Sequence, residues 1–147
     1  MSRFVYTEVP GPFGQAGMLP LISLTLDYVD EEHFQVKRVE VPALVDSGAT
    51  VNVLPRDIGE RFGVNWDEHQ HMFDAVGTIY GHPALALPLF ATIPGHHAKH
   101  LWFAWSELSS KKIRTLLGQT NFFDEFYVDF RKPLGYFEIA FKGERVM

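Results

Sequence analysis

The stretch ALVDSGATVNVLP, from Ala43 to Pro55, decides the fold. An apolar run leads to a single carboxylate, Asp46, which Ser47 and Gly48 follow directly. A carboxylate at the end of a buried strand costs free energy unless hydrogen bonds or chemistry make use of it. The serine hydroxyl can donate a hydrogen bond, and the glycine permits a tight turn and a close approach by another segment. The alternative is a strand that ends in a polar turn, with Asp46 capping its own backbone. The small and β-branched residues that follow favour a functional loop instead.

The composition is that of a single folded domain, residues 1–147. Hydrophobic residues make up 46% of the chain, which suffices for a core and argues against disorder. The formal net charge is −5 and there is no run of Lys or Arg, so we expect no nucleic-acid surface. The sequence contains no cysteine, which excludes disulfides, thiolate metal ligands and a cysteine nucleophile. No stretch approaches the ~20 apolar residues of a membrane span, so we expect a cytoplasmic protein that makes no membrane contact.

Alternating hydrophobicity predicts β-structure over most of the chain. Ile22, Leu24 and Leu26 alternate with polar residues, which is the period of a half-buried strand that begins after Pro20. We place an N-terminal strand and a loop in residues 1–18, and the core of the domain in residues 19–141. The other predicted strands are 4–9, 34–45, 51–54, 73–80, 83–92, 101–105, 113–117, 127–130 and 135–141.

Two short helices and several loops interrupt the predicted strands. Residues 56–62 fit a two-turn helix, and residues 120–126 fit a second helix with its phenylalanines toward the core. Polar or Pro/Gly-rich composition predicts loops or turns at 10–17, 30–33, 66–71 and 94–100. Many short strands with turn signals and one or two short helices indicate a mostly-β domain, either closed or sandwich-like.

Three motifs resemble those of the retropepsin-like (retroviral-type) aspartic proteases, and they occur in the chain in the order 46–49, 75–81 and 116–118. Asp46-Ser47-Gly48-Ala49 is similar to the catalytic loop of that family, and Leu116-Leu117-Gly118 is similar to the apolar-apolar-Gly that precedes the family's helix. Residues 75–81 lie where the family has its flap, a glycine-containing hairpin that closes over the substrate. The resemblance covers residues 19–141 and implies a closed β domain, the pseudo-twofold half of an acid protease.

The resemblance assigns roles to particular positions. Asp46 is the expected catalytic residue, and the rest of the active-site loop is Ser47, Gly48, Ala49 and Thr50. The expected flap consists of Val76, Gly77, Thr78, Ile79, Tyr80 and Gly81. The expected structural support beneath the loop is Leu116, Leu117, Gly118 and Gln119.

The sequence departs from the family pattern in two places. Many retroviral members have an Asp four residues after the catalytic one, paired with an Arg just after the apolar-apolar-Gly, and this chain has Thr50 and Gln119 there. We expect a hydrogen bond between these neutral side chains in place of the ion pair, which avoids an unpaired buried charge. The expected flap carries the bulky Ile79 and Tyr80 at its tip, which implies a stiffer hairpin than the family norm.

The implied reaction needs two carboxylates on one water molecule. The ionised carboxylate takes a proton from the water, and the protonated one donates to the scissile carbonyl oxygen. The chain has one Asp-Ser-Gly, and Asp124 and Asp129, which lack that context, are interpreted as surface or capping groups. The resemblance therefore implies a homodimer with Asp46 of each subunit at its centre and the terminal strands 4–9 and 135–141 in the interface. It also implies an extended peptide or protein substrate, bound as an added strand, and no cofactor.

Other functions compete with this interpretation. A metal site could use the clustered histidines, but their segments are predicted to be solvated turns, so we expect no metal ion; they are His69, His71, His96, His97 and His100. Ser47 is not part of a G-x-S-x-G elbow, which argues against a serine hydrolase. The open alternative is a catalytically silent retropepsin-fold module that dimerises or binds peptides, and Thr50, Gln119 and the bulky flap tip favour it.

Overall fold

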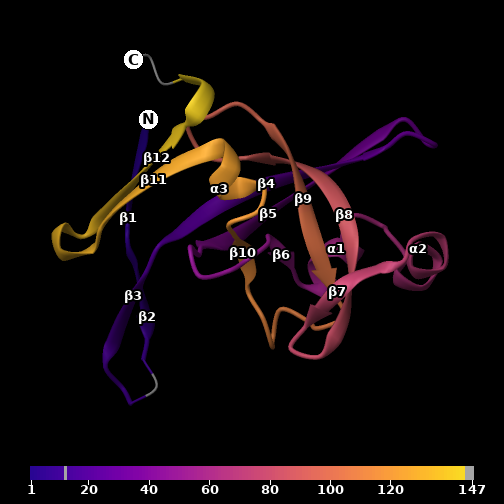
Figure 1. Ribbon diagram of the computed structural model, residues 1–147, viewed down its shortest axis with the longest axis horizontal. Coiled ribbons are helices and arrows are strands. Elements are labelled where there is room, and N and C mark those ends of the chain that lie inside the picture. Colours follow the sequence, from indigo (N-terminus) through magenta and orange to yellow (C-terminus); the bar gives the residue numbers. More distant parts are fainter. Residues whose placement is uncertain (12, 145–147) are drawn as a thin grey trace.

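The computed structural model describes residues 1–11 and 13–144, and the predicted mostly-β class is confirmed, with 54% of the chain in strands and 15% in helices. Six strands form a closed barrel: β4 (Leu21–Asp30), β5 (Gln35–Val45), β6 (Val53–Leu54), β8 (His82–Thr92), β9 (Lys99–Ser106) and β10 (Thr115–Leu117). They are hydrogen-bonded in the order β4-β5-β10-β6-β9-β8, and the pairing of β8 with β4 closes the ring (Figure 1). A closed ring leaves these six strands without a free edge.

Two parallel pairings decide where the loops of the barrel meet. β10 runs parallel to β5, with Leu117 opposite Val45, and β6 runs parallel to β9, with Val53 opposite Ala104. Parallel neighbours end at the same side of a sheet. The segments that follow β5 and β10 therefore lie side by side, and both expected motifs, the one at Asp46 and the one at Gly118, stand at that end.

The N-terminal segment differs from the prediction of one strand, 4–9, and a loop, 10–17. Two strands replace the predicted one, because Tyr6 turns inward: its side chain is buried against the Phe137 ring, 5.4 Å away between centroids, and its N–H donates to the Gly135 carbonyl. β1 (Ser2–Val5) joins β12 (Tyr136–Phe141) and β11 (Phe126–Arg131) in a three-stranded sheet. β2 (Thr7–Pro10) pairs with β3 (Ala16–Leu19), which takes up part of the predicted loop.

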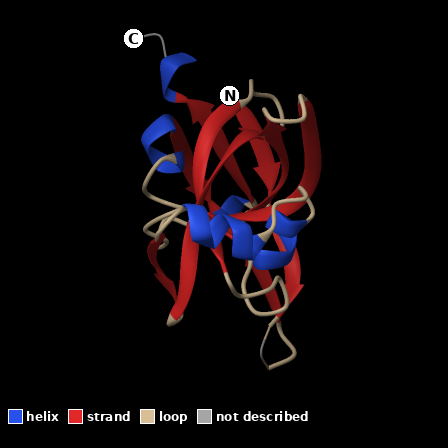
Figure 2. Ribbon diagram, turned by 90° about the vertical axis from the view of Figure 1, so that its right-hand side faces the viewer, coloured by secondary structure: helices blue, strands red, loops and turns tan. Residues whose placement is uncertain are grey.

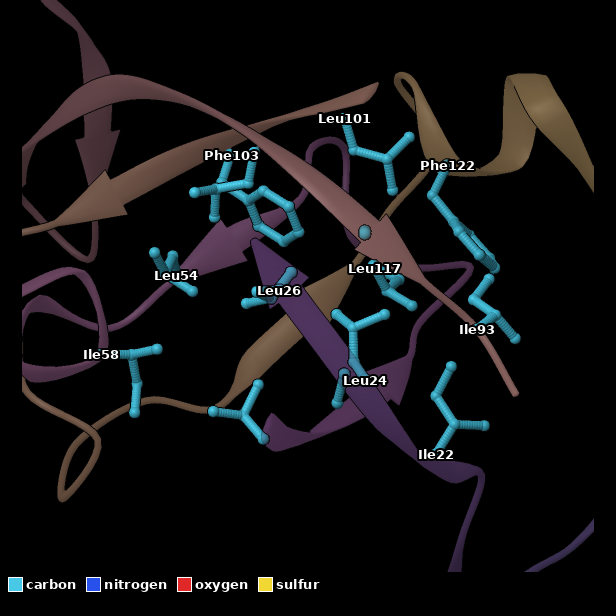
Figure 3. Close-up of a cluster of buried hydrophobic side chains, with 14 of the residues drawn as sticks. Ile22, Leu24, Leu26, Leu54, Ile58, Ile93, Leu101, Phe103, Leu117 and Phe122 are labelled. Atoms are coloured by element: carbon cyan, nitrogen blue, oxygen red, sulfur yellow. The ribbon is translucent and has the colours of Figure 1, made fainter. Parts of the chain in front are cut away.

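The core fills the barrel and extends beneath the three-stranded sheet. The predicted alternation is confirmed on β4, where Ile22, Leu24 and Leu26 are buried. Figure 3 shows them facing Leu54, Leu117 and other apolar side chains from across the ring. The aromatic residues Phe122, Phe126 and Phe137 continue this core toward the three-stranded sheet. Burial of these side chains from opposite strands fixes the register of the ring.

The helices are short and lie outside the strands (Figure 2). α1 (Arg56–Glu60) is shorter than the predicted 56–62, and Gly63, with φ of 82°, follows its end. α3 (Phe122–Glu125) lies within the predicted 120–126. Two turns of 3₁₀ helix, η1 (Lys132–Leu134) and η2 (Lys142–Glu144), flank β12.

The prediction of a loop at 66–71 is wrong, because this segment is the helix α2 (Trp66–Met72). Asn65 caps the helix by accepting a hydrogen bond from the Glu68 N–H at 3.0 Å. Trp66 is the one buried residue of the helix, and it packs edge-on against Trp105, 4.9 Å away between ring centroids. A cap and a single aromatic anchor stabilise a helix whose other residues are polar apart from the exposed Met72 at its end.

The lengths of the helices bear on membrane insertion. α2 is seven residues long, and no helix within residues 1–11 and 13–144 has the length and apolar character needed to cross a membrane.

Candidate functional site

Asp46 begins a tight turn immediately after β5. Its N–H donates to the Leu117 carbonyl at 2.9 Å, which ties it to the end of β10. Its carboxylate Oδ1 accepts from the Gly48 N–H at 2.9 Å, and its carbonyl accepts from the Ala49 N–H at 3.1 Å. Val45 before it is buried in the core, and the Asp46 side chain, just past the end of β5, is half-buried. The turn thus holds a carboxylate at the surface, with Ser47 and Gly48 exposed beside it.

A second segment crosses this turn from the end of β10. The N–H of Gln119 donates to the Ala49 carbonyl at 2.8 Å, and the N–H of Thr120 donates to the Thr50 carbonyl at 2.9 Å. A Cβ on Gly118 would lie 2.4 Å from the Val51 carbonyl oxygen, so only glycine fits where the two segments cross. The close approach expected of Gly118 is therefore present, and Leu116 and Leu117 lead the chain into it.

Gln119 has a different partner from the one expected. We expected its side chain to bond to that of Thr50, but its amide Nε2 donates to the main-chain carbonyl of Ser47 at 2.6 Å. Thr50 is exposed and meets the second segment through its backbone carbonyl. A long neutral side chain can reach past the adjacent position to the turn itself, so Gln119 supports the Asp46 turn directly.

Asn52 is a supporting residue that the sequence analysis missed. It is completely buried, its Oδ1 accepts from the Gly118 N–H at 2.8 Å, and its Nδ2 donates to the Trp102 carbonyl at 3.0 Å. Asn121, also missed, accepts from the Trp102 N–H through Oδ1 at 2.6 Å. Buried amides of this kind are costly unless they are hydrogen-bonded, and one signal was visible: Asn52 interrupts the apolar sequence between Val51 and Val53.

The segment expected to be a flap forms a hairpin. β7 (Ala75–Ile79) pairs antiparallel with β8, with Ile79 opposite His82. Tyr80 and Gly81 make the turn with φ of 50° and 79°, the combination of a type I′ hairpin turn. Tyr80 is 83% exposed at the tip. Gly77, with φ of 142°, lies at a bulge in the pairing, where only glycine is unstrained.

A cavity of about 410 Å³ lies between this hairpin and the segment that follows Asp46. Its walls carry no charged side chain. The lining residues are Thr50, Val51, Val76, Gly77, Thr78, Ile79, Ala84, Ala86, Trp102, Phe103, Ala104, Thr120 and Asn121. Small alanines on β8 and β9 leave the space open, and Trp102, 52% exposed, forms one side. The cavity suits an apolar side chain.

The structure brings some of the predicted site residues together and keeps others apart. The expected active-site loop, Asp46 to Thr50, and its expected support, Leu116 to Gln119, form one hydrogen-bonded unit. Thr50 joins that unit to the hairpin, because it lines the cavity together with Val76 to Ile79. Asp46, Ser47 and Gly48 do not line the cavity, and Tyr80 and Gly81 lie at the exposed tip of the hairpin.

The remaining candidate residues have other partners. Asp124 caps α3 by accepting from the Asn121 N–H, and Asp129 pairs with Arg131, as expected of capping and surface groups. His69 lies on α2, not in the predicted turn, and its ring nitrogen hydrogen-bonds to the Ala86 carbonyl at 2.8 Å. Among the described residues, no group of three or more His, Cys, Asp or Glu side chains could hold a metal ion.

One carboxylate on α1 shows an altered pKa. Burial alone would raise the pKa of Asp57, but hydrogen bonds from the hydroxyl and the N–H of Ser110 outweigh it, and the pKa is lowered. These bonds tie α1 to the loop that leads into β10, and so to the support of the Asp46 turn.

The arrangement offers limited chemistry within one chain. A surface carboxylate can act as a base or an acid toward a water molecule, and the uncharged cavity beside it can bind an apolar group. No family model matches the sequence, and neither the curated proteins nor the solved structures contain a match to the chain.

Proposed function

We propose that this chain is an aspartic endopeptidase of the retropepsin type that acts as a homodimer. The observation that carries the proposal is the Asp46 turn, in which a half-buried carboxylate accepts from the Gly48 N–H and the main-chain N–H of the same residue donates to Leu117. A second segment crosses this turn at a glycine that admits no side chain. A capping aspartate needs no such crossing. The hairpin and the uncharged cavity next to the turn supply a place for substrate.

The dimer follows from the chemistry. Peptide hydrolysis by this route needs one ionised and one protonated carboxyl group on the same water molecule. When two carboxyl groups lie close enough to share that water, the pKa of one is lowered and the pKa of the other is raised. Asp124 and Asp129 are engaged elsewhere. Asp46 of the partner subunit is then the second group, and the exposed Ser47 and Gly48 are the surface across which the two turns meet.

The substrate we propose is an extended peptide segment of a protein. Within residues 1–11 and 13–144, β7 is the last strand of its sheet and has a free edge that can hydrogen-bond to a peptide backbone. The cavity then takes an apolar side chain close to the scissile bond. A cytoplasmic location belongs to this proposal, and cell fractionation tests it.

The decisive experiment combines two variants with a peptide library at mildly acidic pH, with and without pepstatin. Asp46→Asn keeps the volume and the acceptor for the Gly48 N–H but removes the acid and base. We expect cleavage to fall by about 10²–10⁴-fold or more, with the melting temperature unchanged. Asp129→Asn is the matched control, because its carboxylate pairs with neighbouring Arg131 at the surface, and it should retain full activity.

Mixing wild-type and Asp46→Asn chains tests the shared site. With half of the chains substituted and pairing at random, activity should fall to about one quarter of the all-wild-type value. A fall to one half means that each chain works alone and refutes the shared-carboxylate mechanism. A wild-type dimer that binds library peptides and cleaves none establishes instead the silent binding module, which the bulky exposed tip at Tyr80 favours.

A further inference from the structure

The β2–β3 hairpin makes no strand pairing outside itself in the described part of the chain. Figure 1 shows it projecting from the barrel, at the same end as the turn that joins β7 and β8. Three of the four residues of β2 and two of the four residues of β3 are exposed, and none of the eight is buried. Phe13, beyond the end of β2, is 92% exposed.

The base of this hairpin is fixed next to the Asp46 turn. The Pro20 carbonyl, one residue after β3, accepts from the Val45 N–H at 3.0 Å, and Val45 directly precedes Asp46. The other strand leaves from Tyr6, which is buried in the core. The hairpin is therefore anchored at its base beside the carboxylate and unsupported beyond it.

An unsupported hairpin of this kind needs a covering surface. A two-stranded hairpin is marginally stable in water by itself, and its edges carry unpaired backbone groups. Glu8 is the one charged residue between Thr7 and Leu19, so neither edge carries the lysines that commonly protect an exposed strand. Apolar Val9, Phe13 and Met18 suit a protein surface.

We propose that the β2–β3 hairpin is an arm that grips the second copy of this chain. The inference rests on the proposed homodimer, because a water shared by two Asp46 carboxylates requires the partner's turn to lie within hydrogen-bond reach of it. The partner's surface then occupies the space beside Val45 and Pro20, from which the arm projects. In a twofold dimer each arm grips the other subunit. The peptide lies under the β7–β8 hairpin, where the uncharged cavity is.

Truncation of the arm provides the main test. Thr7 and Leu19 lie opposite each other, so an Asn-Gly turn can replace residues 8–18 and close the strands at their base. We expect the Kd of the dimer, measured by sedimentation over a dilution series, to rise by about tenfold or more, the loss of one or two buried anchors. At enzyme concentrations above the new Kd, kcat should return to the wild-type value, since Asp46 and the cavity are retained.

Two exposed phenylalanines give a matched pair of point variants. Phe34 is 95% exposed at the turn between β4 and β5, which Figure 1 shows pointing away from the arm. Phe13→Ser should weaken the dimer, and Phe34→Ser should not. Because the chain has no cysteine, Phe13→Cys and Phe34→Cys can each carry one environment-sensitive dye. Emission should shift to the blue on dimerisation for the dye at position 13 alone.

Each outcome decides the question. An active wild-type dimer whose truncated form keeps the same Kd refutes the arm and leaves the proposed function standing. An unchanged Kd of the dimer with a raised KM would show that the hairpin binds substrate, and it also refutes the proposed contact of the arm with the partner. A wild-type chain that stays monomeric and inactive at all concentrations refutes the proposed function, and the arm with it. If the truncated chain fails to fold, the two dye-labelled variants decide.

Discussion

Gly118 is the residue of the site that accepts no side chain. A Cβ there would meet backbone oxygens of Val51 at 2.4 Å and Ala49 at 2.9 Å, neither of which can rotate away. Gly118→Ala should therefore lower the free energy of unfolding by about 1–3 kcal/mol, as overpacking does, and abolish cleavage by displacing the Asp46 turn. Urea unfolding measures the first effect and a peptide assay the second. Gly17→Ala is the control for the unfolding measurement, since its Cβ would meet Val9 Cγ2 at an ordinary 3.5 Å; equal losses of stability in both variants would contradict the account of the crossing.

Ala86 sets the depth of the uncharged cavity. Its side chain lines the space beneath the β7–β8 hairpin, and a larger residue would fill part of it. Ala86→Leu should reduce kcat/KM by about 10–100-fold for peptides with a bulky apolar residue near the cut, and by much less for peptides with alanine there. Competition between two such peptides in one assay measures the ratio. An unchanged ratio would place the substrate side chain outside this cavity.

Single residues also show where sequence interpretation stops. The position of Asp46 at the end of a buried strand followed from the apolar run before it, and the close approach at Gly118 followed from its motif. The partners of Asn52, Gln119 and Asn121 could not be predicted, because their hydrogen bonds join residues from 19 to 72 positions apart in the chain. Such contacts depend on the register of the closed ring, which alternation along one strand does not specify.

Among the elements, α1 depends on a carboxylate whose charge matters. The pKa of Asp57 is lowered in the folded protein, so its ionised form stabilises the fold above the ordinary aspartate pKa of about 3.9, and this contribution is lost as the pH falls through the lowered value. Asp57→Asn should therefore lower the melting temperature at pH 7, and the difference from wild type should shrink below about pH 4. Calorimetry from pH 2 to 7 measures this, with Asp129→Asn as the exposed control. A difference that stays constant with pH would show that shape and not charge holds α1.

Some strands and helices could be predicted from the sequence, and others could not. β4 and β8 were predicted within two residues, because their apolar side chains alternate or run together over ten and eleven residues. α2 was missed because one buried tryptophan gives no helical period, and its start depends on the Asn65 cap. The break at Tyr6 was missed because the residue turns toward a ring, Phe137, that is distant in sequence.

At the scale of the whole molecule, the proposed dimer makes activity depend on concentration. One chain supplies one carboxylate in the Asp46 turn, so a monomer should not cleave peptides, and specific activity should rise with enzyme concentration until the dimer saturates. Assays and sedimentation over one dilution series should give the same midpoint. Full specific activity from a demonstrated monomer would refute the shared site.

The same pairing predicts how the reaction responds to pH. Cleavage should fall at low pH, where both carboxyls are protonated and no base remains, and at high pH, where both are ionised and no acid remains. The two midpoints belong to the pair of carboxyls. A rate that climbs steadily toward alkaline pH, measured on a peptide without titratable side chains, would exclude this mechanism.

The pairing of β6 with β10 is the weakest in the ring, and β10 supports the Asp46 turn. β6 has two residues and β10 has three, and these two shortest strands are neighbours. Fewer backbone hydrogen bonds must break there than anywhere else in the ring, so local opening of the native state should begin between them. Asn52 adds side-chain hydrogen bonds at this seam, one of them from the Gly118 N–H. The Gly118 N–H is freed when this seam opens, and the segment that supports the Asp46 turn is freed at the same time. Amide hydrogen exchange at Gly118 therefore measures both how often the barrel opens and how often the Asp46 turn loses its support.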